Sequence, residues 1–435
     1  MGETVGPVRW RAEADRLFGR LAGRFARVET RRRARGFVSG LLGDLPRKNC
    51  WSIAEHAGDP DPHGMQHLLN RAVWDTNGAR DDLRDYVIGG LGDANAVLVV
   101  DETGDVKKGS HTVGVQRQYT GTAGRIENAQ VAVYLTYAGA RGHAMIDREL
   151  YLPKSWTSDP DRCTAAGVPE DIGFLTKPAL ATGMLARALD AGVPARWVAG
   201  DEVYGADPGL RTELEIREIG YVLGIGCDRR VPTAAGPMRA DTLTASLPRW
   251  AWQRLSAGAG AKGQRYYDWA LIELDAPPDT PPAQETDTQC WWLLVRRHRH
   301  SGELAFYRCY SPHMVALREL VRVAGRRWTV EESFQAGKGL AGLDEHQVRR
   351  WTPWRRWTLL AMLAHALLAV IAANEHTDHP EPTGLVALTC NEIRRLLTIL
   401  VTEPSRNLAY LQAWSHWRRR HQYRARTCHY QQQKA

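Results

Sequence analysis

The sequence predicts a mixed α/β fold, in which a sheet is flanked by helices. Between about residues 95 and 225, short apolar runs of strand length alternate with longer segments of helical period. Ala96–Val100 is apolar throughout, as expected for a central strand that is covered on both faces. The order of these segments is three strands, a helix, a strand, a helix and a strand, and helical patterns dominate both ends of the chain.

Each element of this core has a local signal. Val131–Tyr137 and Ala144–Leu152 have strand character and are joined by a glycine-containing turn, so that with Ala96–Val100 they should form an antiparallel meander. Helices are expected over Pro178–Ala191 and Pro208–Ile219, each ending next to a glycine. A strand should follow each helix, at Arg196–Ala199 and at Tyr221–Ile225.

The regions outside this core are also patterned. Near the N-terminus, Ser52 is a candidate cap for a short helix over Ile53–Ala57, and Met65–Trp74 is periodic after an intervening turn. Leu359–Ala373 is apolar but too short to span a bilayer, which favours a buried helix. A β-rich insertion is predicted from strand-like segments at Tyr266–Leu274, Cys290–Arg297 and Leu304–Tyr310, with a Pro- and acid-rich loop over Ala276–Gln289.

Composition limits the class of protein. The 435 residues are too many for one compact core, so two or three domains are expected. The net charge of +8 suits a polyanionic partner. Seven scattered cysteines without a C-x-x-C pair argue against a disulfide framework or a zinc site, and the start of the chain has no apolar signal region. No P-loop, G-x-S-x-G or dinucleotide-binding glycine pattern is present.

Two basic segments are candidates for phosphate contacts. Residues 1–36 contain ten arginines and four acids, and the densest run comprises Arg31, Arg32, Arg33 and Arg35. A solvated helix face explains this run equally well. A second group of candidate phosphate contacts lies in a polar, glycine-rich stretch and consists of Lys107, Lys108, Arg117 and Tyr119. The alternative interpretation of this stretch is an ordinary solvated loop.

Three carboxylates are candidates for a metal site. Asp101 and Asp201 each follow an apolar strand-like run. Glu331 lies in a helical segment, where Arg327 precedes it by four residues and Lys338 follows it by seven, so these three side chains share one helix face. Divalent cations that activate water and stabilise a leaving oxygen take hard oxygen ligands of this kind.

Neighbouring acids are weaker candidates. Glu102 should point to the opposite face of a strand from Asp101. Glu332 lies about 100° around the helix from Glu331, off the face shared with Arg327.

The spacing Arg327-x3-Glu331-x6-Lys338 resembles the R-E-K part of the Y-R-E-K signature of DDE-type insertion-sequence transposases. Asp101 in VVDETG and Asp201 in AGDEVYG resemble the two aspartates of that family. The resemblance covers about residues 40–370. It implies a ribonuclease-H-like catalytic core, whose order of elements agrees with the predicted one. Ala324 stands where the signature has tyrosine, which leaves the processing of the DNA ends, including hairpin formation, open.

The resemblance implies a DNA transposase that cleaves and joins DNA at the ends of an insertion sequence. Asp101, Asp201 and Glu331 would be catalytic and would bind two Mg²⁺ ions, for which Mn²⁺ can substitute. The implied partners are double-stranded DNA at transposon ends and target DNA, and a second copy of the chain in a homodimer. Neither a membrane partner nor a nucleotide cofactor is expected. The expected location is the bacterial cytoplasm, in association with the nucleoid. The implied DNA-binding residues are Arg327, Lys338, Lys107, Lys108, Arg117, Tyr119, Arg31, Arg32, Arg33 and Arg35.

The expected domains follow from these assignments. They are a helical DNA-binding region (1–90), the first part of the catalytic core (91–227), the β-rich insertion (228–311), the core helices with Glu331 (312–375) and a basic C-terminal region (376–435). Two alternatives stay open: a catalytically silent, transposon-derived DNA-binding protein, and a related endonuclease without strand transfer.

Overall fold

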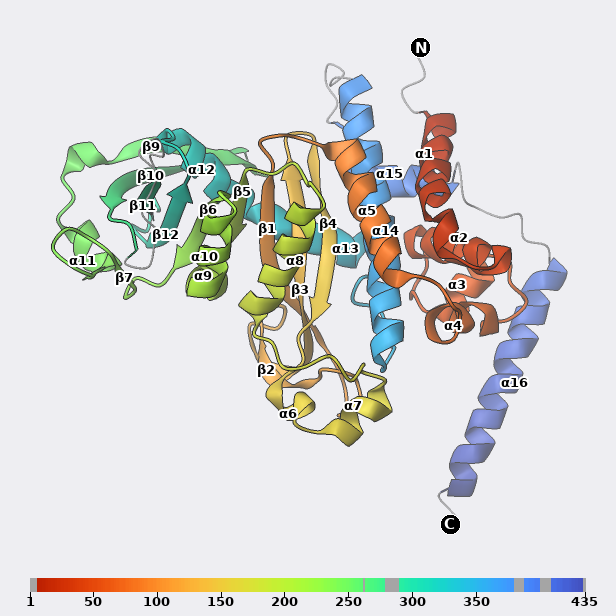
Figure 1. Ribbon diagram of the computed structural model, residues 1–435. Helices are drawn as coiled ribbons and strands as arrows, with labels where there is room; N and C mark the ends of the chain where they lie inside the picture. Colours follow the sequence, from red (N-terminus) through yellow and green to blue (C-terminus); the bar gives the residue numbers. More distant parts are fainter. Residues whose placement is uncertain (1–5, 261–262, 278–288, 379–386, 400–407, 433–435) are drawn as a thin grey trace. The chain divides into compact units, whose positions relative to one another are not determined.

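The computed structural model describes residues 6–260, 263–277, 289–378, 387–399 and 408–432. The chain forms two compact units (Figure 1). The helical unit comprises residues 1–86, 166–168 and 335–435, and the sheet unit comprises residues 87–165 and 169–334.

The sheet unit is built on one ten-stranded mixed sheet. Its strand order is β2-β3-β1-β5-β6-β12-β11-β10-β9, and β4 also pairs with β3. The strands are β1 (Val97–Val106), β2 (Gln116–Thr120), β3 (Arg125–Gly139), β4 (Gly142–Leu150), β5 (Trp197–Gly200), β6 (Gly220–Ile225), β9 (Gln253–Gly260), β10 (Gly263–Leu274), β11 (Cys290–Arg297) and β12 (Leu304–Ser311).

The predicted meander is confirmed, because β1 and β4 both pair antiparallel with β3. The next two strands run parallel: β5 pairs with β1, and β6 pairs with β5. The sequence did not predict β2, whose residues Gln116–Thr120 are mostly polar and pair with the outer part of β3.

The three strands predicted in the insertion are confirmed as β10, β11 and β12. A fourth strand, β9, was missed because its glycines and small residues lack a clear apolar alternation. These strands extend the main sheet, because β12 pairs antiparallel with β6. Most of the predicted loop, residues 278–288, lies outside the described residues.

Local caps explain the helices that cover this sheet. Thr176 accepts a hydrogen bond from the Ala179 amide at the start of α8 (Lys177–Asp190), as an N-cap does. Asp207 caps α10 (Pro208–Ile216) in the same way. The latter helix ends earlier than predicted, because Glu218 has a left-handed φ of 56° that interrupts helical geometry.

The helical unit is organised around α14 (Trp351–Asp378), whose predicted burial is confirmed. Among the described residues this is the one helix long and apolar enough to cross a membrane, but 94% of its apolar window is buried inside the protein, as in a core helix. It packs on α2 (Val28–Leu42), where the Phe37 and Trp357 rings meet edge to face at 5.3 Å.

Two helices near the N-terminus have different ends from those predicted. α3 (Cys50–His56) is capped by Asn49, and Ser52 completes the capping box from the third helical position, so Ser52 is not the cap itself. α4 (His63–Asn70) begins earlier and ends before Trp74. The Arg356 guanidinium donates to the carbonyl groups of Leu68, Leu69 and Ala72 and so satisfies the end of α4.

The remaining elements complete the two units. They are α1 (Pro7–Arg20), the 3₁₀ helix η1 (Leu21–Arg24), α5 (Thr76–Leu91), α6 (Lys154–Thr157), α7 (Pro160–Ala166), α9 (Glu202–Gly205), the paired strands β7 (Arg230–Val231) and β8 (Met238–Arg239), α11 (Ala240–Ala245), η2 (Arg249–Ala251), α12 (Leu317–Arg326), α13 (Trp328–Ala341), α15 (Cys390–Leu397) and α16 (Leu408–Gln432).

The contact between α12 and β9 gives a test of the fold. A Cβ atom at Gly325 would lie 1.9 Å from the carbonyl oxygen of Ala257, so Gly325→Ala has to push α12 away from the strand. We expect a loss of stability of about 1–3 kcal/mol or more, measured by urea unfolding. Gly183→Ala in α8 is the matched control, because its Cβ would have only the Arg187 guanidinium nearby, at 3.9 Å. It should stabilise the protein by about 0.4–1 kcal/mol. Equal stability of the two variants would contradict the close packing.

Candidate active site

The pairing of β1 with β5 brings Asp101 and Asp201 side by side. The last paired residues of these parallel strands are Val100 and Gly200, so the two aspartates are the next residues on adjacent strands. The two strand-like runs that precede the aspartates are therefore neighbours in the sheet. Asp101 is not at a strand end, however, because β3 pairs with β1 as far as Val106. Asp201 does leave the sheet and caps α9, accepting a hydrogen bond from the Val203 amide at 2.9 Å.

The sheet register also assigns Asp101 to a face. Asp101 lies opposite Tyr134 on β3, and directly opposed residues project to the same side. The Tyr134 ring packs on Phe334 of α13 at 5.4 Å. Asp101 therefore projects to the face that α13 covers.

Glu102 projects to the other face, as predicted. Its carboxylate accepts hydrogen bonds from the Lys177 ammonium of α8 at 2.5 Å and from the Tyr204 hydroxyl of α9 at 2.6 Å. The sequence did not single out either partner. Tyr204 lies three residues after Asp201, but neither residue belongs to a pattern that identifies it.

Arg327 connects Asp101 to the helix that carries Glu331. Its Nη1 atom is 3.2 Å from Asp101 Oδ2 and 4.0 Å from Glu331 Oε1. Arg327 lies at the junction of α12 and α13, so the predicted helix over this stretch is confirmed from Trp328 onward, with a separate helix before it. The two acids that neutralise this guanidinium are distant in sequence but meet at one atom.

Glu332 has a different partner. Its Oε2 atom is 3.2 Å from Nε2 of His143 on β4, and the other ring nitrogen of His143 is 2.8 Å from the buried Ser333 hydroxyl. These contacts fix α13 against β4 and keep Glu332 away from Arg327. The geometry therefore favours Glu331 as the third carboxylate.

Burial makes the two aspartates costly to ionise. Asp101 is 7% exposed, and burial, reinforced by the negative charge of Asp201, raises its pKa to about 8 although Arg327 lowers it. Burial also raises the pKa of Asp201, with the charge of Glu102 as the next cause. A bound cation would relieve both effects, so this pair of oxygen donors fits a divalent ion such as Mg²⁺.

The third expected ligand is not gathered with the first two. Within the residues that the structure describes, no three His, Cys, Asp or Glu side chains are clustered closely enough to hold a metal ion. The Glu331 side chain is 50% exposed and lies beyond Arg327 from Asp101. Three uncompensated carboxylates repel one another, and here the Arg327 guanidinium lies between Glu331 and Asp101.

The predicted basic residues of the sheet unit lie around the outer part of β1, β2 and β3. Arg117 and Tyr119 are exposed neighbours on one face of β2 and pair with Asn128 and Ile126 of β3. Because residues two apart share a face, this is the face that carries Tyr134 and Asp101. Lys108 is exposed, whereas Lys107 lies 4.0 Å from Asp105.

The remaining predicted residues belong to the helical unit. Lys338 lies in the C-terminal part of α13, which belongs to the helical unit. On α2, Arg31 and Arg32 are exposed, whereas Arg33 is half-buried. Arg35 forms an ion pair with Asp15 at 2.5 Å and stacks over Phe18.

Binding of a divalent cation can be tested without an activity assay. Asp201→Asn removes a charge but keeps an N-cap side chain for α9. Without metal it should melt no lower than the parent protein, because repulsion at the buried pair falls. MgCl₂ or MnCl₂ should raise the melting temperature of the parent by about 2–4 °C per kcal/mol of binding free energy, and this rise should disappear in the variant.

Asp207→Asn is the control for this test, because Asp207 caps α10 in the same way and lies outside the carboxylate pair. It should keep the metal-dependent rise. An equal rise in both variants would exclude Asp201 as a ligand.

The comparisons with known proteins agree with this geometry. The family described as DDE superfamily endonuclease matches residues 20–255, which include Asp101 and Asp201 but end before Glu331. The chain is also 29% identical over 315 residues to a probable transposase for insertion sequence element IS701 from Microchaete diplosiphon, covering 72% of this chain and 75% of that protein. The family match extends over more than half of the sequence, and the chain belongs to the DDE superfamily endonucleases.

Proposed function

We propose that this chain is the transposase of an insertion sequence, of the Y-R-E-K group, and that Asp101, Asp201 and Glu331 are its catalytic residues. The observation that carries this proposal is the Arg327 guanidinium, which contacts Asp101 and lies 4.0 Å from Glu331 beside the paired aspartates. The similarity to the probable IS701 transposase supports the same function.

The proposed metal ligands are these three carboxylates. When bound, two Mg²⁺ or Mn²⁺ ions supply activation of the attacking water or 3′-hydroxyl group and stabilisation of the leaving oxygen. The chain supplies the positions: β1 is paired on both sides and holds Asp101 rigidly, and the α9 cap fixes Asp201. Arg327 compensates the carboxylates, and its planar fork also suits a DNA phosphate.

The proposed DNA contacts are shared between the two units. Arg327, Lys107, Lys108, Arg117 and Tyr119 belong to the sheet unit, where Arg117 and Tyr119 share the face of Asp101. The helical unit would contribute Lys338 and the arginine run 31–35. We propose double-stranded transposon ends and target DNA as partners, a homodimer in the DNA complex and a location at the bacterial nucleoid in the cytoplasm.

The functional parts of the proposal keep their sequence-based bounds. Residues 1–90 bind DNA, residues 91–227 and 312–375 form the catalytic core, residues 228–311 are the insertion, and residues 376–435 are a basic C-terminal region. An endonuclease without strand transfer is the second candidate, since Ala324 replaces the signature tyrosine.

Two adjacent glutamates provide a sharp test of catalysis. Glu331→Gln keeps the size of the side chain but removes one negative charge from the proposed metal site. We expect cleavage of duplex DNA that carries the element's own ends to fall by roughly 10²-fold or more, the loss typical of removing one charge-stabilising catalytic group. DNA binding should persist, because affinity comes mainly from arginines and lysines.

Glu332→Gln is the matched control and should cleave far better than Glu331→Gln, because Glu332 pairs with His143. If Glu332→Gln alone is inactive, the assignment is one residue out. If both variants cleave normally, the three-carboxylate site is wrong. A parent protein that binds the ends but never cleaves in Mg²⁺ or Mn²⁺ would favour the silent DNA-binding protein.

The arginine run on α2 is testable by salt dependence. Arg31 and Arg32 are exposed, so Arg31→Gln/Arg32→Gln should lower the slope of log K against log salt by about two units, one for each lost phosphate contact. Arg35→Gln should change the slope less, because Arg35 is paired with Asp15. An unchanged slope in the double variant would assign the run to solvent.

A further inference from the structure

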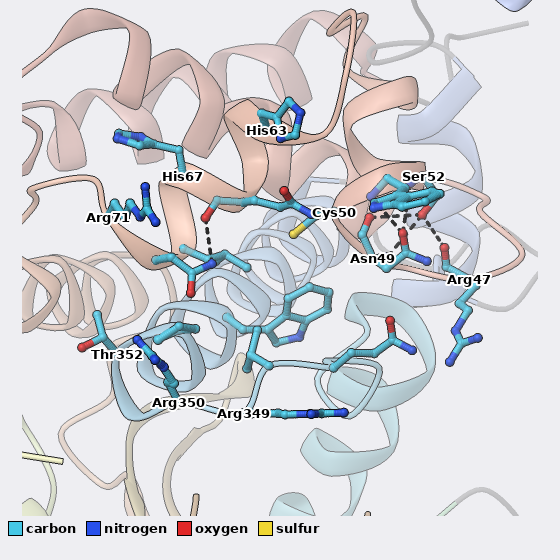
Figure 2. Close-up of a pocket in the computed structure, with 18 of the residues that line it drawn as sticks. Arg47, Asn49, Cys50, Ser52, His63, His67, Arg71, Arg349, Arg350 and Thr352 are labelled. Carbon is cyan, nitrogen blue, oxygen red and sulfur yellow. Dashed lines mark hydrogen bonds between the residues drawn. The ribbon is translucent and has the colours of Figure 1, made fainter. Parts of the chain in front are cut away.

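The helical unit contains a large groove, lined by both polar and apolar side chains, that the proposed catalytic residues do not use. Its volume is about 1380 Å³, above the roughly 300–1,000 Å³ of small-molecule pockets. One wall is α3 and α4 with the residues next to them, and the other is the segment 347–353 (Figure 2). A groove of this size favours a polymer over a metabolite.

The lining carries an excess of unpaired positive charge. Arg47, Arg71, Arg349 and Arg350 are all exposed. Their guanidinium groups form no ion pair or side-chain hydrogen bond with the rest of the described chain. The acid in this lining, Glu55, is already neutralised by Arg418 at 2.6 Å. Four guanidinium groups without counter-charges are therefore available to a polyanion.

The arginines come from both walls. In Figure 2, Arg71 lies on the side of α4 with His67, whereas Arg349 and Arg350 extend from the opposite segment. The exposed edge of α4 adds the hydrogen-bonding groups of His63, His67 and Asn70. Its other edge, with Met65, Leu68 and Leu69, is buried in the core.

Buried polar contacts hold both walls in place. Arg356 of α14 donates to the carbonyl groups at the end of α4, as described above. On the other side, the backbone amide of Lys48 donates to Glu345 at 2.6 Å, and its buried ammonium donates to the Leu340 carbonyl at 2.9 Å. These bonds tie the start of α3 to the chain leading into segment 347–353, so the groove is formed before a ligand binds.

We propose that this groove binds the sugar–phosphate backbone of duplex DNA, with Arg47, Arg71, Arg349 and Arg350 on its phosphates. Guanidinium groups bind phosphate oxygens through paired donors, and such contacts position a duplex without reading its sequence. The proposal rests on the proposed function for the identity of the polyanion. It adds a binding surface whose arginines are separate from the run 31–35 and from the carboxylates.

The test removes two adjacent charges from one wall. Arg349→Gln/Arg350→Gln is compared with the parent for binding a fluorescein-labelled 25-base-pair duplex over a range of NaCl concentrations. The slope of log K against log salt should fall by about two units, one for each phosphate contact. The fold should be unaffected, because neither side chain has a partner within the described residues, and circular dichroism melting checks this.

Arg9→Gln/Arg395→Gln is the matched control. Both arginines are exposed in the same unit, lie outside the groove and pair with surface acids, so the same net charge is removed. The control should leave the slope within about half a unit of the parent's. An equal fall in both double variants, or no fall in Arg349→Gln/Arg350→Gln, would overturn the proposal. So would an effect confined to a single-stranded 25-mer or to an acidic peptide.

The binding and cleavage assays together show which of the two proposals is wrong, the groove proposal or the proposed function. If the groove variant has a reduced slope but the parent never cleaves DNA, the groove proposal stands and the catalytic one fails. If Glu331→Gln abolishes cleavage but the groove variant binds as the parent does, the catalytic proposal stands and the groove does not bind DNA. A parent that does not bind the duplex at low salt contradicts both.

Discussion

The parallel pairing of β1 with β5 is the constraint on which the sheet unit depends. It fixes two buried carboxylates side by side, and both have raised pKa values because burial penalises their charged forms. A fold tolerates this only if a counter-charge is nearby. Arg327 provides it from 226 residues further along the chain. The chain between β6 and α12 therefore has to return to the sheet close to β6, and it does so because β12 pairs with β6.

The register around Asp101 explains how neighbouring acids have separate environments. Alternation along β1 sends Asp101 towards α13 and Glu102 towards α8 and α9. On α13, a rotation of about 100° separates Glu331, near Arg327, from Glu332, on His143. Glu102 and Glu332 thus have partners separate from the Arg327 guanidinium, which Asp101 and Glu331 share. Such separation limits the repulsion among four carboxylates that would otherwise share one buried region.

The sequence predicted what depends on local periodicity and failed where tertiary contacts decide. The apolar run before Asp101 identified a central strand, and the helix spacing correctly separated Glu331 from Glu332. The same reasoning ended β1 too early, because the pairing with β3 that carries it to Val106 is non-local. It missed β2 because a polar strand at an edge has no apolar pattern. Lys177 and His143 reach their acids only through the packing of distant elements, which no spacing encodes.

The two units have opposite electrostatic character. The sheet unit concentrates acids at the candidate active site, whereas the groove of the helical unit has four guanidinium groups without acids to neutralise them. Three carboxylates carry more negative charge than the one Arg327 guanidinium offsets, and this excess opposes the binding of a DNA phosphate. The favourable free energy of DNA binding must then come from cations elsewhere in the chain, reinforced by the release of counterions from DNA. A basic surface separate from the carboxylates is the arrangement that this conflict requires.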